Sequence, residues 1–117
     1  MTIFLVGVGG VVGVLARYAL GTAVPGNALP WLTVGINIVG SFLLGLLVAE
    51  QRFSRDMHEG LGVGFLGGFT TFSTFSVQAV LEVEGGRPET AVIYVLASVL
   101  GGLAAAAAGY ALGRSLA

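Results

Sequence analysis

Long apolar stretches separated by short polar connections dominate the sequence. Four of them approach the roughly 20 residues that a helix needs to cross a bilayer, and they cover residues 2–23, 31–50, 60–81 and 90–112. Because the connections are short, neighbouring helices are expected to run antiparallel. The pattern predicts an all-α membrane protein with four transmembrane helices, in which residues 1–117 form a single transmembrane domain.

The composition agrees with a membrane location. Hydrophobic residues make up 56% of the chain and charged residues only 9%, whereas a soluble domain averages about 25% charged residues. The chain contains no cysteine, which excludes disulfides and thiolate metal sites. Its net charge of −1 argues against a nucleic-acid partner. The N-terminus lacks a basic region and an obvious cleavage site, so we expect Met1 to begin the first span rather than a removed signal.

The third apolar stretch is interrupted. Gly67 and Gly68 are followed by five hydroxyl residues within the next eight positions. Each glycine costs a helix interior about 1 kcal/mol relative to alanine. Backbone groups that leave a helix find no water in hydrocarbon, so irregular backbone there must face protein or a water-filled path. We therefore expect the third helix to be broken at its centre, and we expect this break to be the functional site.

Phenylalanines alternate with hydroxyl residues after the glycine pair. Phe69, Phe72 and Phe75 recur every three residues, with Thr71 and Thr74 on a neighbouring face. Aromatic residues at helical spacing are typical of packing, and this interpretation stays open. An aromatic ring also has a positive edge, which can stabilise an anion without trapping it as a fixed charge would. The hydroxyl residues beside the rings favour this second interpretation, because lipid-facing packing does not require them.

Polar side chains also interrupt the other three spans. Arg17 lies several residues inside the first span, where a charge costs at least about 2.5 kcal/mol. It either reaches the interface along its alkyl stem, or caps buried carbonyls, or charges the mouth of an anion path. Asn37 and Ser41 share one face of the second span, where the amide makes an interhelical hydrogen bond or offers N–H donors to an anion. Tyr94 and Ser98 share one face of the fourth span, where a polar track and a simple hydrogen bond to a neighbouring helix fit the spacing equally well.

The chemistry that the sequence lacks narrows the functional classes. Carboxylates occur only in the connections and at span ends, as with Glu50 and Glu82. A small dual-topology, proton-coupled multidrug exporter needs a carboxylate inside the membrane, so this alternative is disfavoured. A non-conducting membrane scaffold needs only glycine-rich packing, but it leaves the hydroxyl and phenylalanine residues unexplained. His58 stands alone in a charged connection and is expected to be solvated. Because no catalytic constellation is present, we expect the protein not to be an enzyme.

The basic residues leave two orientations open. Arg52, Arg55 and Arg114 lie on one side of the predicted membrane domain, and Arg87 and Arg17 lie on or near the other. The positive-inside rule needs a clear excess of basic residues on one side, and this bias is small. Either both termini face the cytoplasm, or the chain inserts both ways round.

Three motifs, in order, resemble the Fluc (CrcB) family of fluoride ion channels. The motifs are Gly9-Gly10-Val-Val-Gly13-Val-Leu-Ala-Arg17-Tyr18, Gly35-Ile-Asn37-Ile-Val-Gly40-Ser41-Phe42, and Gly67-Gly68-Phe-Thr-Thr-Phe-Ser-Thr-Phe75-Ser76. The resemblance extends over all four spans. It implies an antiparallel, dual-topology homodimer with two fluoride pores. It also implies passive, fluoride-selective flow across the cytoplasmic (inner) membrane, which gives fluoride resistance, with fluoride, the lipid bilayer and a second copy of the chain as partners.

The resemblance further implies roles for individual residues. The fluoride pore would be lined by side chains from the second, third and fourth spans: Asn37, Ser41, Thr71, Phe72, Thr74, Phe75, Tyr94 and Ser98. Arg17 would lie near a vestibule. The backbone carbonyls of Gly67 and Thr70 would bind one structural Na⁺ between the subunits. Such a cation agrees with the physics of the break, because carbonyls released within a membrane need a partner.

Overall fold

The computed structural model of the protein describes residues 1–116. Within this range all regular structure is helical, which confirms the predicted all-α class. The elements are, in chain order, α1 (Thr2–Thr22), the 3-10 turn η1 (Gly26–Ala28), α2 (Leu29–Ala49), α3 (Arg55–Glu59), the π-helical segment η2 (Gly60–Leu66), α4 (Gly67–Phe69), α5 (Phe72–Glu84) and α6 (Pro88–Leu116).

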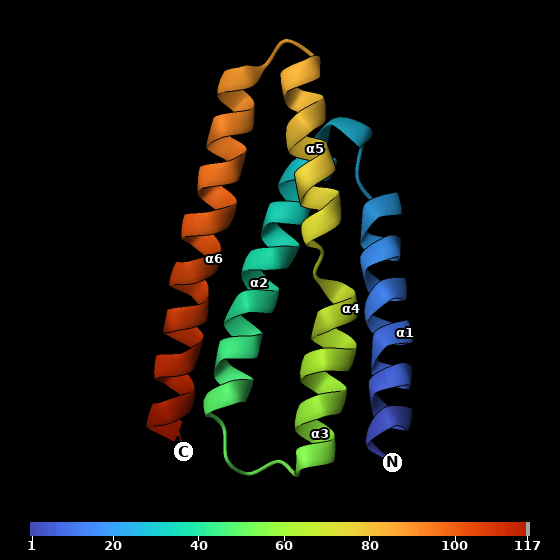
Figure 1. Cartoon of the computed structure of the whole chain (residues 1–117), viewed down its shortest axis with the longest axis vertical. Coiled ribbons are helices and arrows are strands. Elements are labelled where there is room, and N and C mark those ends of the chain that lie inside the picture. The colour runs from blue at the N-terminus through green and yellow to red at the C-terminus, as the bar shows by residue number, and fades with distance from the viewer. Residues whose placement is uncertain (117) are drawn as a thin grey trace.

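The helices run as successive passes along the long axis of the molecule (Figure 1). α1, α2 and α6 are the first, second and fourth passes, whereas α3, η2, α4 and α5 together form the third. The N-terminus, the α2–α3 connection and the C-terminal end of α6 lie at the same end of the molecule (Figure 1). Among the described residues, three helices are long and apolar enough to cross a membrane: Thr2–Thr22, Gly26–Ala49 and Pro88–Leu116. These helices support a multi-pass membrane protein, with a divided third pass.

The second, third and fourth helical passes begin before the apolar stretches that predict them. α2 begins at Leu29 and has Pro30 in its first turn. Proline lacks a backbone N–H, but N–H groups in the first turn of a helix have no partner within the helix, so no hydrogen bond is lost there. The third pass begins at Arg55, inside the charged connection, because the Ser54 side chain accepts a hydrogen bond from the Met57 N–H at 3.2 Å and caps α3. α6 is also longer than its apolar stretch at both ends.

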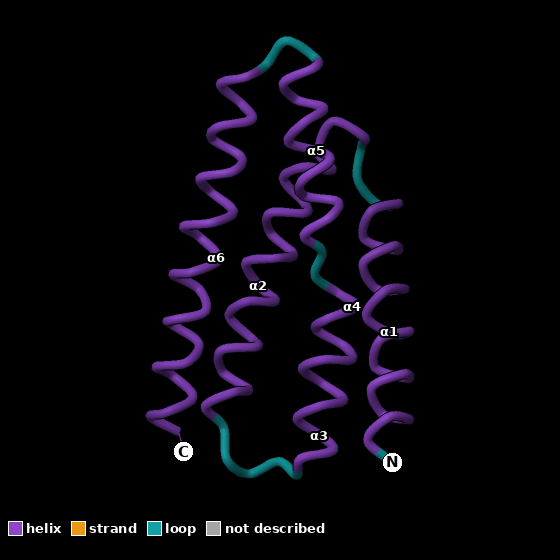
Figure 2. The backbone as a smooth tube through the Cα atoms, viewed as in Figure 1, coloured by secondary structure: helices purple, strands orange, loops and turns teal. Residues whose placement is uncertain are grey.

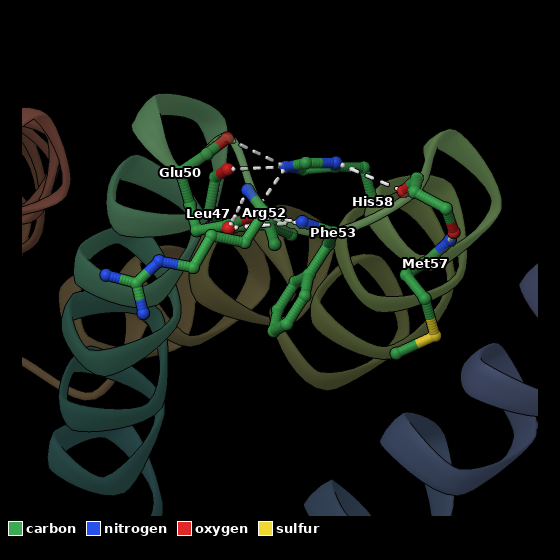
Figure 3. Close-up of polar contacts among 7 residues, drawn as sticks. Leu47, Glu50, Arg52, Phe53, Met57 and His58 are labelled. Atoms are coloured by element: carbon green, nitrogen blue, oxygen red, sulfur yellow. Dashed lines mark hydrogen bonds and ion pairs between the residues drawn. The ribbon is translucent and has the colours of Figure 1, made fainter. Parts of the chain in front are cut away.

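His58 joins two elements at the end of the molecule where α2 meets α3 (Figure 3). Its Nε2 lies 3.0 Å from the Leu47 carbonyl oxygen and 3.2 Å from Oε2 of Glu50, at the C-terminal end of α2. Its Nδ1 lies 3.2 Å from the Ser54 carbonyl oxygen. His58, which we expect to be solvated rather than a ligand, keeps 27% of its side chain exposed but also bonds to neighbouring parts of the chain. Its partners are the Leu47 and Ser54 carbonyl oxygens and the Glu50 carboxylate, which the turn between α2 and α3 brings close.

Glycines let the second and fourth passes approach closely. α2 and α6 form the most extensive helix pair in the described chain. A Cβ atom at Gly45 would collide with the Ala106 carbonyl oxygen, and one at Gly109 would collide with the Phe42 carbonyl oxygen. Backbone therefore meets backbone at these positions, as is typical of membrane helix pairs with small residues at the contact.

We expect Gly109→Ala to lower the thermal stability of the protein. The added methyl group collides with backbone rather than with a flexible side chain, and such overpacking costs about 1–3 kcal/mol. Gly7→Ala is the matched control, because a Cβ atom there has no neighbour within 4 Å. Thermal unfolding in detergent should give a lower Tm for Gly109→Ala alone. Equal Tm values for the two variants would contradict the close contact between α2 and α6.

Candidate functional site

The third pass is broken at Thr70 and Thr71 (Figure 2). Thr70 has φ −88° and ψ 158°, and Thr71 has φ −153° and ψ 120°, so both residues are extended. α4 ends immediately before them and α5 begins immediately after them. The central break that the sequence leads us to expect is present in the structure.

The break lies beyond the glycine pair that predicts it. Gly67 and Gly68 are helical. A Cβ atom at Gly68 would lie 2.6 Å from the Gly10 carbonyl oxygen, so this glycine allows α4 to approach α1. The irregular backbone belongs instead to threonines, whose hydroxyls bond nearby backbone and compete with helix formation. The Thr70 hydroxyl, for example, donates to the Leu66 carbonyl oxygen at 2.8 Å.

The side chain of Asn37, on α2, bridges the break. Its Nδ2 donates to the Thr71 carbonyl oxygen at 3.0 Å, and its Oδ1 accepts from the Thr71 N–H at 2.9 Å. Both backbone polar groups of Thr71 are thereby satisfied inside the molecule, as hydrocarbon surroundings require. The Thr71 hydroxyl accepts from the Thr74 N–H at 3.2 Å and caps α5. Two roles are considered for Asn37 from the sequence, an interhelical hydrogen bond and a donor to an anion. The structure shows the hydrogen bond.

The pairing of Thr71 with Asn37 releases a backbone carbonyl of α4. In a continuous helix the Thr71 N–H would bond to the Gly67 carbonyl four residues earlier, but here it bonds to Asn37. The neighbouring Gly68 carbonyl oxygen accepts a hydrogen bond from Arg17 Nε, on α1, at 3.2 Å. Of the roles considered for Arg17, the capping of a carbonyl is therefore the one that the structure shows.

A groove of about 460 Å³ lies beside the break, and we call it the break groove. Its walls come from α2, η2, α4, α5 and α6 as well as from the two extended threonines. It includes eight of the residues singled out from the sequence: Asn37, Ser41, Gly67, Thr70, Thr71, Phe72, Phe75 and Ser98. Thr74 and Tyr94 are not part of its lining. None of the lining residues is charged, so the groove offers polar and aromatic groups without a fixed charge.

The two phenylalanines of the break groove differ in exposure. Phe72 is 77% exposed, whereas Phe75 is only 7% exposed. Their ring centroids are 5.5 Å apart, and the ring planes are inclined at 62°. The groove therefore has one exposed and one buried aromatic side chain, both near the start of α5.

Tyr94 packs behind Phe75 rather than in the groove wall. Its side chain is completely buried, and its ring centroid lies 5.0 Å from that of Phe75. Its hydroxyl donates to Oε1 of Gln78, on α5, at 2.8 Å. Gln78 was missed in the sequence analysis. The available signal is that it is an amide one turn after Phe75 in an otherwise apolar stretch.

Ser98 supplies an unused donor to the break groove. Its Oγ is buried and has no hydrogen-bond partner among residues 1–116. Buried polar atoms are almost always hydrogen-bonded, so such an atom calls for a partner from outside the described chain. A hydroxyl of this kind can donate to an anion or bond to a water molecule.

The family model described as CrcB-like protein, Camphor Resistance (CrcB), matches residues 4–110, which include Arg17, Asn37 and the break. The chain belongs to this family. A CrcB-like relative from Agrobacterium fabrum, named "Fluoride-specific ion channel FluC", is 45% identical over 99% of this chain and 98% of its own length. A relative of the same name from Sphingopyxis alaskensis is 45% identical over 98% of this chain and 97% of its own length. Another, from Thermus thermophilus, is 42% identical over 96% of this chain and 94% of its own length.

The comparison confirms the resemblance found in the sequence motifs. The CrcB-like relatives are named as ion channels rather than as enzymes, in agreement with the expectation that this chain is not an enzyme. The family match spans all four passes, so the break and the three helices around it belong to the matched region.

We expect Asn37→Leu to destabilise the fold. The substitution leaves the N–H and C=O of Thr71 without their partners, and an unsatisfied buried polar group costs about 1–3 kcal/mol. Asn27→Leu is the control, because Asn27 lies on an exposed turn. Thermal unfolding should show a clearly lower Tm for Asn37→Leu than for Asn27→Leu. A wild-type Tm for Asn37→Leu would mean that the break does not depend on this amide.

Proposed function

We propose that this chain is a fluoride-selective ion channel of the cytoplasmic (inner) membrane, through which fluoride leaves the cell passively, giving fluoride resistance. Relatives that are 42–45% identical over almost their whole length carry the name of a fluoride-specific ion channel. The structural observation that carries the proposal is the break groove. It combines a broken helix, polar side chains that include the unpaired Ser98 hydroxyl, and aromatic rings, without any fixed charge.

The groups in the break groove suit an anion that must bind and then leave. Asn37 uses one N–H of its amide on Thr71, and an amide nitrogen has a second N–H to offer. The Ser98 hydroxyl is an unpaired donor within the described chain. The rings of Phe72 and Phe75 can present positive edges. Together these groups replace part of the hydration shell of fluoride, while the absence of a cationic lining residue avoids a trap.

The remaining polar residues support this lining from behind or beside it. Thr74 lies next to the groove, and the hydroxyl oxygens of Thr71 and Thr74 are 3.2 Å apart. Ser41 extends the polar lining along α2. Arg17 lies near the break through its bond to the Gly68 carbonyl, and in the proposed channel it adds positive potential near a vestibule rather than in the pore.

We infer that the functional unit is an antiparallel, dual-topology homodimer with two pores. One subunit leaves the break incompletely covered: Phe72 is 77% exposed beside it. Irregular backbone at membrane depth must be buried in protein or line a water-filled cavity, so a second subunit has to cover this region. The small charge bias between the two ends of the chain is compatible with insertion in both orientations.

A structural Na⁺ between the subunits fits the released carbonyls. The Gly67 carbonyl has lost its helical donor to the Asn37–Thr71 pair, and the Thr70 carbonyl lies in the extended break. Among residues 1–116 no group of three His, Cys, Asp or Glu side chains could hold a metal ion, so carbonyl oxygens are the suitable ligands here. A hard monovalent cation bound to them would offset their partial negative charge.

The proposal is tested by fluoride efflux from liposomes that contain the purified protein, with chloride efflux as the comparison. The wild-type protein should release fluoride much faster than chloride. Phe75→Ile, which removes a ring edge, and Asn37→Asp, which replaces donors by a negative charge, should each lower fluoride flux at least about tenfold, a factor equivalent to about 1.4 kcal/mol. Phe4→Ile is the matched control, because Phe4 is exposed on α1 outside the break groove.

Three results would count against the channel. Absent wild-type efflux, or equally fast chloride efflux, would remove the fluoride-channel proposal. Near-normal flux in both Phe75→Ile and Asn37→Asp would show that the break groove is not the pore. A proton-dependent flux of organic cations would favour the exporter, although the break groove contains no carboxylate.

We expect the chain to insert in both orientations. Because the sequence contains no cysteine, Gln51→Cys introduces a single thiol in the exposed connection between α2 and α3. In intact cells a membrane-impermeant thiol reagent should label about half of the protein, and permeabilisation should expose the rest to label. Complete labelling or complete protection before permeabilisation would indicate one fixed orientation.

A further inference from the structure

Gln78 and Tyr94 form a polar pair behind the break groove. The Tyr94 hydroxyl donates to Oε1 of Gln78 with an oxygen–oxygen distance of 2.8 Å. Tyr94 is completely buried, and neither residue lines the groove. The hydrogen bond therefore satisfies the one polar atom of a buried aromatic side chain. It also fixes how far the tyrosine ring reaches from α6 toward α5.

The Tyr94 ring is held between two other rings. Its centroid lies 5.9 Å from that of Trp31, with the planes at 82°, and 5.0 Å from that of Phe75, with the planes at 55°. Val34 completes the buried cluster around Tyr94 and Phe75. A shift of Tyr94 consequently changes the surroundings of both neighbouring rings.

The orientation of the Phe75 ring decides the sign of its effect on an anion. The edge of an aromatic ring is positive and its face is negative. The torsion that turns a phenylalanine ring has broad minima, so packing rather than intrinsic preference sets the orientation. Phe75 is 7% exposed and lines the break groove, so the part of the ring that reaches the groove depends on what packs behind it.

We propose that Gln78 is a positioning residue that acts through Tyr94 to hold the Phe75 ring in its orientation at the break groove. Phe75 and Gln78 lie one turn apart on α5, and Tyr94 contacts both from α6. The three side chains form a closed loop between the two helices. The proposal rests on the proposed fluoride channel, and it makes a residue outside the groove a determinant of fluoride flux and selectivity.

The test compares four single variants in liposomes. Gln78→Leu removes the acceptor, Tyr94→Phe removes the donor, and Gln78→Glu keeps an acceptor oxygen at the same place. Tyr110→Phe is the matched control, because Tyr110 is an exposed tyrosine on the same helix. Gln78→Leu and Tyr94→Phe should each lower the ratio of fluoride to chloride flux about threefold to tenfold, the factor that corresponds to one neutral hydrogen bond. Gln78→Glu should keep most of the wild-type ratio of fluoride to chloride flux, and Tyr110→Phe should leave that ratio unchanged.

Two further readouts separate positioning from a general loss of stability. The double variant Gln78→Leu/Tyr94→Phe should lose no more than either single variant, because all three changes remove the same hydrogen bond. Trp31 is the only tryptophan in the chain, and its ring packs on Tyr94. Its fluorescence emission should therefore change in Gln78→Leu and in Tyr94→Phe but not in Tyr110→Phe.

Additive losses in the double variant, or a normal flux ratio in Gln78→Leu and Tyr94→Phe, would overturn the positioning role. So would a Trp31 emission that is unchanged in both variants. A wild-type protein that conducts no fluoride would instead remove the proposed function, and the Trp31 readout would still report whether Gln78 positions the aromatic rings.

Discussion

The structure depends on the pairing between the Asn37 amide and the backbone of Thr71. A helix broken inside hydrocarbon exposes N–H and C=O groups that water cannot reach. The Asn37 amide donates to the Thr71 carbonyl oxygen at 3.0 Å and accepts from the Thr71 N–H at 2.9 Å. It does so from a helix 34 positions earlier in the sequence. This single side chain makes it possible for the third pass to leave helical geometry at Thr70 and Thr71 and to begin again as α5.

The break also lets the third pass change partners. Its first half, η2 and α4, packs mainly on α1, whereas α5 packs mainly on α6 (Figure 1). A glycine makes the first of these contacts close, because Gly68 of α4 lies against Gly10 of α1. α2 contacts both halves and carries the amide that bonds to Thr71 between them. The groove beside this junction therefore has walls from the second, third and fourth passes, and its polar side chains come only from α2, α6 and the two threonines of the break.

Much of this arrangement follows from the sequence, because the bilayer restricts what an apolar chain can do. The four passes follow from the lengths of the apolar stretches, and the central break follows from glycines beside hydroxyl residues. The position of the break does not follow, because Gly68 serves helix contact with Gly10 and the threonines interrupt the helix. The bond from His58 to Leu47 crosses the connection between α2 and α3, and the contact of Tyr94 with Phe75 joins α6 to α5. Periodicity within one helix reveals neither contact.

The central claim is that the third pass is broken at Thr70 and Thr71 within a lipid bilayer and that Asn37 satisfies the freed backbone. Solid-state NMR of isotopically labelled protein in lipid bilayers measures this directly through backbone chemical shifts. We predict extended shifts at both threonines between helical neighbours, with a cross-peak between the Asn37 side-chain amide and Thr71. Helical shifts running without interruption through this segment, with no such cross-peak, would contradict the account.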